Sequence, residues 1–218
     1  MSAPERGAKD TVPARVSFPA MAGPIDPLRS VLVLVDYQAK LLPAIHGGAG
    51  ALANAVRLAD AARLLGIRVV GTEENPAGLG ASDPAIGSRC DAMLAKRHFD
   101  ACGDGLVPLL AAPDRAPPAD AVIAGCESHV CLLQTALGLI RAGLRVFVVG
   151  EACGSRSPSD HAAALDRLRA AGAAVVTVEM TIFEWLRTCD HPRFREALVL
   201  VKAAGAADGF PGGTDSPG

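Results

Sequence analysis

The sequence predicts a doubly wound α/β fold, in which one three-layer domain is built around a mainly parallel sheet. Short apolar runs rich in β-branched residues alternate with longer stretches of helical periodicity, and several of those stretches end at a glycine. The chain has 218 residues, of which 50% are hydrophobic, so it is long enough to bury one sizeable core. Because β-α-β units close with right-handed crossovers, this alternation places helices on both faces of the sheet.

The first β-α-β unit occupies residues 30–72. Residues 30–35, "SVLVLV", form an uninterrupted apolar run, which is typical of a strand buried on both faces. Apolar residues then recur every three or four positions over 50–65, which predicts a helix that ends before Gly66. The run "IRVVGT" at 67–72 is the second predicted strand.

The same alternation continues through the second half of the chain. The glycines at 143 and 172 mark two helix ends, and an apolar run follows each. The predicted elements are a strand at 121–125, a helix at 129–142, a strand at 144–150, a helix at 158–171 and a strand at 173–179.

The two ends of the chain differ from the middle in composition. Residues 1–26 mix Pro, Gly, Ala and both charge signs without periodicity, which predicts a flexible lead. Residues 205–218 are rich in Gly and Pro and predict a flexible tail. The folded domain is therefore expected at 27–204.

The net charge indicates the kind of partner, and the cysteine content indicates the redox state of the thiols. The formal net charge is -2 and the pI is about 6.2, so no basic surface is predicted for nucleic acid or an anionic membrane, and a small-molecule substrate fits better. Nothing at the N-terminus resembles a secretory signal, and the cysteines have no CxxC spacing, so we expect reduced thiols in the cytoplasm. An even cysteine count leaves disulfides arithmetically open, but a domain of this size does not need them.

Ligands of open parallel sheets bind outside the carboxyl ends of the strands, and three segments lie there. They are Asp36, "TEENP" at 72–76 and "GCESHVC" at 125–131. Cys131 is expected in the first turn of a helix, where the dipole favours a thiolate, although cysteine also often fills a core. Cys126, nearer the strand end, is the alternative nucleophile.

Charged residues beside these cysteines have two interpretations each. Asp36 follows five consecutive apolar residues, so it either caps a turn or, paired with a cation, takes a thiol proton. Lys96 in "MLAKRHFDAC" lies between helical stretches. It is either a solvated surface lysine or the cation that pairs with Asp36. His129 is two residues before Cys131, a spacing that turns it to another helix face and disfavours it as the base.

Several blocks of the sequence resemble, in order, those of the isochorismatase-like cysteine hydrolase superfamily. The blocks are "VLVLVDYQAKLL", "TEENPAGLG", "AKRHFDA", "AGCESHVCLLQTALGLIRAGLRVFVVGEACGSRS" and "DHAAALDRLRAAGAAVVTVEMTIFEWL". The resemblance covers residues 30–200 and is greatest to the subgroup of small, metal-free amidohydrolase-like proteins. The Gly-x-Glu-Ser/Thr-His-x-Cys block is its most specific part.

The resemblance implies a role for each of these residues. Cys131 would be the nucleophile, Asp36 its base and later a proton donor, and Lys96 the charge partner that favours the thiolate. A cis peptide bond would join Cys126 to Glu127. It would turn the N–H of Glu127 towards that of Cys131, so that both donate to the oxyanion.

Departures from the superfamily's patterns narrow the reaction. Nicotinamidases of the superfamily bind a metal through an Asp-x-His pattern after the second strand, where this chain has "TEENP", and no two of its histidines have helical ligand spacing. We therefore expect no metal, and the absence of a Gly-rich phosphate loop predicts no nucleotide cofactor. Isochorismatases lack the cysteine, so Cys131 disfavours isochorismate as substrate.

These observations predict a hydrolase that cleaves a C–N bond of a small amide through a thioester. Two alternatives stay open: a hydrolase of another small-molecule bond (ester, carbamoyl or vinyl ether), and a non-catalytic or redox-responsive protein on the same fold. The resemblance and the plentiful apolar residues also predict a homo-oligomer.

Overall fold

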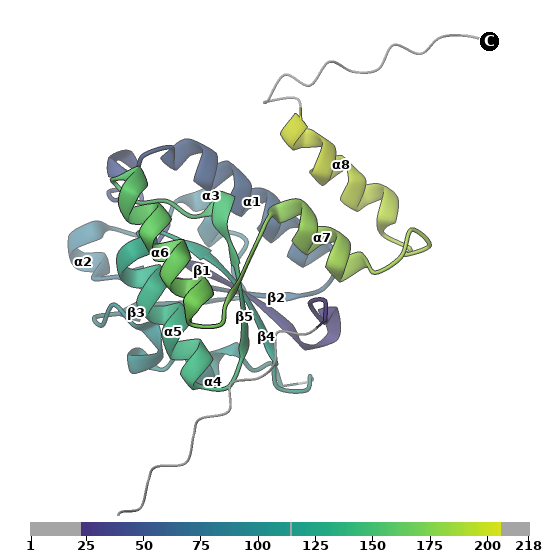
Figure 1. Ribbon diagram of the computed structural model, residues 1–218, viewed down its shortest axis with the longest axis horizontal. Coiled ribbons are helices and arrows are strands. Elements are labelled where there is room, and N and C mark those ends of the chain that lie inside the picture. The colour runs from purple at the N-terminus through teal and green to yellow at the C-terminus, as the bar shows by residue number, and fades with distance from the viewer. Residues whose placement is uncertain (1–22, 114, 206–218) are drawn as a thin grey trace, which may run out of the picture.

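A six-stranded, all-parallel sheet forms the centre of the computed structural model, which describes residues 23–113 and 115–205 (Figure 1). The strand order is β3-β2-β1-β4-β5-β6, so the chain winds outward from β1 in one direction and from β4 in the other. The predicted doubly wound α/β fold is confirmed. The strands are β1 (Ser30–Val35), β2 (Arg68–Glu74), β3 (Ala92–Lys96), β4 (Asp120–Gly125), β5 (Arg145–Val149) and β6 (Ala174–Val176).

Helices cover both faces of the sheet because the two windings cross over on opposite sides. The long helix α1 packs with α7 and α8 on one face, whereas α5 and α6 pack together on the other (Figure 1). The α-helices are α1 (Gly48–Leu64), α2 (Pro76–Leu79), α3 (Pro84–Gly87), α4 (Leu106–Leu110), α5 (Leu133–Arg141), α6 (Pro158–Ala170), α7 (Val178–Leu186) and α8 (Phe194–Gly205).

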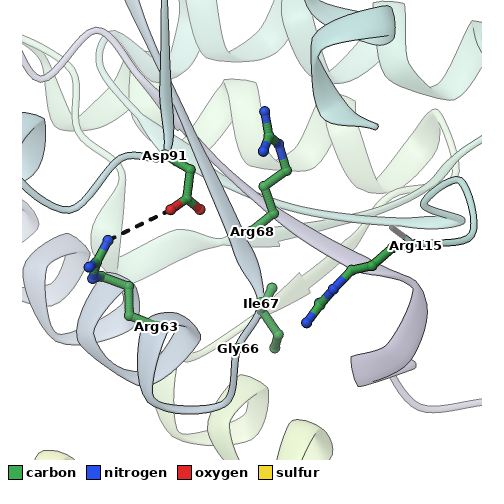
Figure 2. A pocket seen from close by; sticks show the side chains of 6 residues that line it. All are labelled: Arg63, Gly66, Ile67, Arg68, Asp91 and Arg115. Carbon is green, nitrogen blue, oxygen red and sulfur yellow. Dashed lines mark ion pairs between the residues drawn. The ribbon is translucent and has the colours of Figure 1, made fainter. Parts of the chain in front are cut away.

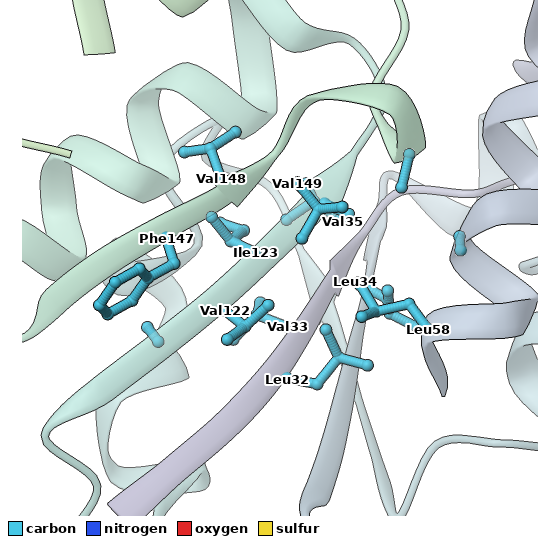
Figure 3. Close-up of a cluster of buried hydrophobic side chains, with 14 of the residues drawn as sticks. Leu32, Val33, Leu34, Val35, Leu58, Val122, Ile123, Phe147, Val148 and Val149 are labelled. Atoms are coloured by element: carbon cyan, nitrogen blue, oxygen red, sulfur yellow. The ribbon is translucent and has the colours of Figure 1, made fainter. Parts of the chain in front are cut away.

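The core is densest around the two central strands. Every residue of β1 and of β4 is buried, and Figure 3 shows Leu34 of β1 and Leu58 of α1 among the side chains of this core. Burial on both faces explains why these strands are continuous apolar runs instead of alternating ones. The two strands lie side by side in parallel register, from Ser30 opposite Asp120 to Val35 opposite Gly125.

Strand β3 was missed by the sequence analysis, which placed Lys96 in a segment between helices. The strand is short, lies at the sheet edge and alternates between partly buried and exposed residues until the buried Lys96. An edge strand of this kind has no long apolar run to identify it. Its pairing with β2, which aligns Glu74 with Lys96, defines it instead.

Two other predicted boundaries were wrong. The strand predicted at 173–179 ends at Val176, because Thr177 caps helix α7 by accepting a hydrogen bond from the Met180 N–H (3.1 Å). The helix predicted at 129–142 begins as a π-helical turn, η4 (Ser128–Leu132), and becomes α-helical only in α5. Cys131 lies in the π-helical turn.

The segment just before β1 packs against the domain. Ile25 is fully buried, and its N–H donates to Glu184 Oε2 (2.8 Å). The Asp26 N–H donates to the buried Asp120 (2.7 Å). Residues 23–26 of the predicted lead thus pack against the domain, while the rest of that lead and residues 206–218 of the predicted tail lie outside the described residues. Within the described ranges, no helix is long and apolar enough to cross a bilayer.

Candidate active site

Four polar segments meet at the carboxyl edge of the sheet because four neighbouring strands end there. Asp36 directly follows β1, Glu74 and Lys96 are the last residues of β2 and β3, and Cys126 directly follows β4. The strand order reverses between β1 and β4, which is where open α/β sheets bind their ligands. The fold therefore brings residues that are up to 90 positions apart in sequence to one edge.

Asp36 is held by contacts to β2 and β3. Its backbone has a left-handed conformation (φ 54°), and its N–H donates to the Thr72 carbonyl oxygen (3.1 Å). The Thr72 hydroxyl donates to Asp36 Oδ1 (2.7 Å), whereas Oδ2 lies 2.8 Å from Lys96 Nζ. Oδ2 pairs with Lys96 by charge but accepts no well-aligned hydrogen bond from the described residues, so it keeps capacity to take a proton.

Lys96 is a fully buried cation between two carboxylates. Its Nζ lies 2.8 Å from Asp36 Oδ2 and 2.8 Å from Glu74 Oε2, and its side chain is 0% exposed. Burial acts to lower the pKa of Lys96, but Asp36 and then Glu74 outweigh it, so the pKa is raised and the ammonium is retained. A buried lysine needs such partners, and Lys96 is paired with carboxylates instead of solvated at the surface.

Cys131 lies beside this ion pair. Its Sγ and one oxygen each from Asp36 and Glu74 lie within 4.8 Å of one another. Burial and then the Asp36 carboxylate raise the pKa of the Cys131 thiol to about 12, while Lys96 acts in the opposite direction. The lowered pKa expected from a helix start is therefore not found, because burial next to a carboxylate has the larger effect. The resting thiol is protonated, with a proton acceptor next to it.

The raised pKa predicts slow alkylation of Cys131 at neutral pH. A raised pKa reduces the thiolate fraction at every pH below it, so the labelling rate with iodoacetamide should climb about tenfold per pH unit through the mildly alkaline range. Peptide mass spectrometry measures this rate, with the exposed Cys189 of the same chain as the accessibility reference. A rate that reaches its plateau near neutral pH would instead indicate a preformed thiolate.

The segment between β4 and Cys131 has an unusual backbone. The peptide bond between Cys126 and Glu127 is cis. Gly125 precedes it, and any Cβ there would collide with the backbone of Val35, so glycine permits the close approach of β4 to β1. The Ser128 N–H donates to the Gly154 carbonyl oxygen (2.8 Å), whereas the Glu127 N–H has no acceptor among the described residues.

The other candidates from the sequence lie elsewhere. Cys126 is completely buried, and its thiol pKa is raised beyond the range reached by Cys131, mainly by burial. His129 contacts the Ser155 hydroxyl through Nδ1 (3.0 Å), and no hydrogen bond joins its ring to Cys131 in the described part of the chain. Neither residue shares the arrangement that surrounds Cys131.

The same cluster offers the ligand atoms that a metal ion would need. Within the described ranges, Asp36, Glu74 and Cys131 are the group of candidate ligands that lies close enough together. Lys96 Nζ already lies 2.8 Å from both carboxylates. A metal ion next to this ammonium would be repelled, so the arrangement fits a protein cation better than a metal.

Two residues of the site were missed by the sequence analysis. Glu74 belongs to the "TEENP" segment that was singled out for its position, but a glutamate at a strand end gives no further signal. Gln38 is fully buried and hydrogen-bonds the backbone of Glu74 on both sides: its Nε2 donates to the Glu74 carbonyl oxygen (3.0 Å), and its Oε1 accepts from the Glu74 N–H (3.0 Å). Only the folded chain brings the two together.

A cavity of about 280 Å³ lies at the opposite edge of the sheet, where β2 begins (Figure 2). Figure 2 shows Arg63 directed at Asp91, while the guanidinium groups of Arg68 and Arg115 point away from each other. Among the described residues, its lining has no cysteine, serine or threonine, and the cavity is separate from the cysteine site. It is lined by Arg63, Gly66, Ile67, Arg68, Asp91 and Arg115.

Comparison with known proteins identifies the family. The model of the isochorismatase domain matches residues 30–180, which include all of the residues grouped around Cys131. The chain belongs to the isochorismatase family. Isochorismatase domain-containing protein 2A of Mus musculus is 36% identical over 185 residues, which are 84% of this chain and 87% of the mouse protein.

Solved structures of other proteins share the fold. The MAR1 ribonuclease of Caenorhabditis elegans superposes with a TM-score of 0.77 at 30% identity, over 89% of this chain and 100% of the nematode chain. The YcaC gene product of Escherichia coli, described as an octameric hydrolase of unknown specificity, superposes with a TM-score of 0.70 at 22% identity, over 86% of this chain and 100% of the other. At that identity the second likeness concerns the fold alone.

Proposed function

We propose that this isochorismatase-family protein is a cysteine hydrolase that cleaves a C–N bond of a small amide through a thioester, with Asp36, Lys96 and Cys131 as its catalytic residues. The observation that carries the proposal is the buried Asp36–Lys96 ion pair next to the Cys131 thiol. A carboxylate with a free acceptor site, a retained ammonium and a protonated thiol are the groups that nucleophilic catalysis by cysteine needs.

In the first half of the reaction, the acyl group of the substrate is transferred to Cys131. Asp36 takes the thiol proton as Sγ attacks the carbonyl carbon, which avoids a free thiolate in a site where the pKa is about 12. The oxyanion of the tetrahedral adduct accepts hydrogen bonds from the backbone N–H groups of Glu127 and Cys131. Asp36 then gives its proton to the leaving nitrogen, the C–N bond breaks, and an amine leaves behind a thioester.

In the second half, water releases the acyl group. Asp36, again a carboxylate, takes a proton from water as the water oxygen attacks the thioester carbonyl. Collapse of the adduct breaks the C–S bond, the sulfur regains a proton, and a carboxylic acid departs. Lys96 keeps its charge throughout and offsets the negative charge of Asp36 at the start and of the developing thiolate during each transfer.

The charge at the site favours an uncharged or cationic substrate over an anionic one. Asp36 and Glu74 carry two negative charges against the single positive charge of Lys96, so the three groups sum to -1. The nematode relative is described as a ribonuclease, and RNA is a polyanion. A surplus negative charge would repel a phosphodiester, so cleavage of RNA is the less favoured activity for this chain.

We further propose that the protein assembles into a homo-oligomer. Support comes from α7 and α8, where Met180, Phe183 and Val199 are exposed large apolar side chains. Such surface is commonly covered in an assembly.

A panel of small substrates tests the proposed reaction. Purified protein is incubated with primary amides, ureides, esters, a vinyl ether and an RNA oligonucleotide, and intact-protein mass spectrometry follows covalent adducts. We expect turnover of amides together with an acyl adduct on Cys131 that hydroxylamine removes. Turnover of the oligonucleotide or of the vinyl ether without any adduct would overturn the proposal, and no turnover of any substrate in the panel would favour the redox or non-catalytic alternative.

A further inference from the structure

Glu74 is the fourth charged or nucleophilic residue of the cysteine site, and the proposed reaction assigns it no step. Its Oε2 lies 2.8 Å from Lys96 Nζ, and one of its oxygens lies within 4.8 Å of both Cys131 Sγ and an Asp36 oxygen. A carbonyl carbon bonded to Sγ would therefore have neighbouring atoms within hydrogen-bond reach of this carboxylate.

The backbone of Glu74 is fixed independently of any ligand. The Gln38 side-chain amide hydrogen-bonds both its N–H and its carbonyl oxygen, and the next residue, Asn75, donates from its N–H to the Lys96 carbonyl oxygen (2.9 Å). Gln38 itself is fully buried. A carboxylate held in this way is preorganised, which is the property that a specific binding group requires.

Glu74 also differs from its neighbours in exposure. The side chains of Asp36 and Lys96 are 0% exposed, whereas that of Glu74 is 13% exposed. Its second oxygen, Oε1, has no hydrogen-bond or ion-pair partner among the described residues. Of the three charged groups, Glu74 is thus the one that meets the solvent side of the site, and it presents a free acceptor there.

Neutralising Lys96 does not require a second carboxylate. Asp36 already balances the single charge of Lys96 at 2.8 Å, so Glu74 adds one negative charge for which the site holds no cation. A partly buried carboxylate without a full counter-charge is costly unless another donor or cation arrives. An ionised carboxylate only accepts hydrogen bonds, so the incoming group must be a donor.

We infer that Glu74 is a specificity-determining residue whose free carboxylate oxygen binds an N–H or ammonium group adjacent to the scissile carbonyl of the substrate. This inference rests on the proposed amide hydrolysis and narrows it to donor-bearing amides. Substrates such as α-amino amides and ureides satisfy the carboxylate, whereas those with a carboxylate or phosphate at that position are repelled.

Two alkylating reagents of similar size but different charge test this role without knowledge of the substrate. The rate of Cys131 modification is measured with neutral iodoacetamide and with anionic iodoacetate in the native chain and in Glu74→Gln. Both reagents use the same thiolate, so the ratio of the two rates cancels any change in its pKa. We expect Glu74→Gln to raise the iodoacetate-to-iodoacetamide ratio about tenfold, because a like charge roughly 5 Å away is removed.

The matched control is Glu73→Gln. Glu73 is the preceding residue of β2, its carboxylate accepts from the Ser82 N–H (2.7 Å), and adjacent strand residues point to opposite faces of the sheet. This variant changes the net charge of the protein by the same amount and should leave the ratio unchanged. An unchanged ratio in Glu74→Gln, or equal increases in both variants, would overturn the inference while the proposed thiol chemistry stood.

Hydrolysis of paired amides gives the second readout. Glycinamide carries an ammonium group at neutral pH, and propionamide is its uncharged counterpart of similar size. We expect the native chain to favour glycinamide in kcat/KM and Glu74→Gln to reduce that preference about tenfold or more, as for loss of a hydrogen bond to a charged group. An equal decrease of kcat/KM on both amides in Glu74→Gln would mean that Glu74 acts only through Lys96, and it would contradict the inference. Absence of an acyl adduct with either amide would count against the proposed function itself.

Discussion

Replacing Cys131 with alanine is expected to reduce amide hydrolysis by on the order of 10⁴-fold or more and to abolish the covalent adduct. The reason is that the thioester pathway needs the sulfur itself, and no other thiol shares the contacts of Cys131 with the Asp36–Lys96 pair in the described part of the chain. The measurement combines steady-state kinetics with intact-protein mass spectrometry on a slowly hydrolysed amide. Full activity in Cys131→Ala would exclude the mechanism.

Cys189→Ala is the matched control for this substitution. Cys189 is an exposed thiol in the turn after α7, so its removal should change neither turnover nor adduct formation. Cys131 is 6% exposed, and its replacement by alanine removes a single heavy atom, the sulfur, which leaves only a small void in the packing. Equal melting temperatures of the two variants would show that the loss in Cys131→Ala is chemical.

Asp36→Asn and Lys96→Met are expected to shift the Cys131 thiol pKa in opposite directions and yet both to lower activity. Asp36 raises this pKa and Lys96 lowers it, so removing the carboxylate should lower the pKa and removing the ammonium should raise it. Activity falls in Asp36→Asn because the base is lost, by about 10²- to 10⁴-fold. Ultraviolet titration of the thiolate, with Cys131→Ala as the blank, measures the pKa values.

Lys96→Met is also expected to lower the stability of the fold. Lys96→Met leaves the buried Asp36 carboxylate without its cation, which should cost about 3 to 5 kcal/mol of unfolding free energy in urea denaturation. Lys40→Met is the matched control, because Lys40 is an exposed lysine whose Nζ donates to the Gly78 carbonyl oxygen (3.2 Å) and has no carboxylate partner among the described residues. Shifts of the thiol pKa in the same direction for both site variants would contradict the assigned charge roles.

Several parts of the fold could be predicted from the sequence because their cause is local. The apolar, β-branched run at 31–35 has no polar interruption, as is typical of a strand covered on both faces, and β1 and its neighbours were predicted to within two residues. Glycines at 66, 143 and 172 have positive φ and end their helices where expected. Strand β3 could not be found in this way, because an edge strand is defined by its partner β2.

The sequence by itself determined the fold class, the edge of the sheet on which chemistry would lie, and Asp36, Lys96 and Cys131 as candidates for it. The fold class and the sheet edge follow from periodicity and strand ends, whereas the roles of the three residues follow from the family resemblance of the motifs that contain them. The tertiary structure was needed to show that Lys96 is buried between two carboxylates and that the pKa of Cys131 is raised. It was also needed to show that Glu74 belongs to the site, held by the two hydrogen bonds between the Gln38 side chain and its backbone. Charge interactions and desolvation depend on distances of a few ångströms between residues far apart in the chain, and those distances exist only after β1, β2, β3 and β4 have been laid side by side.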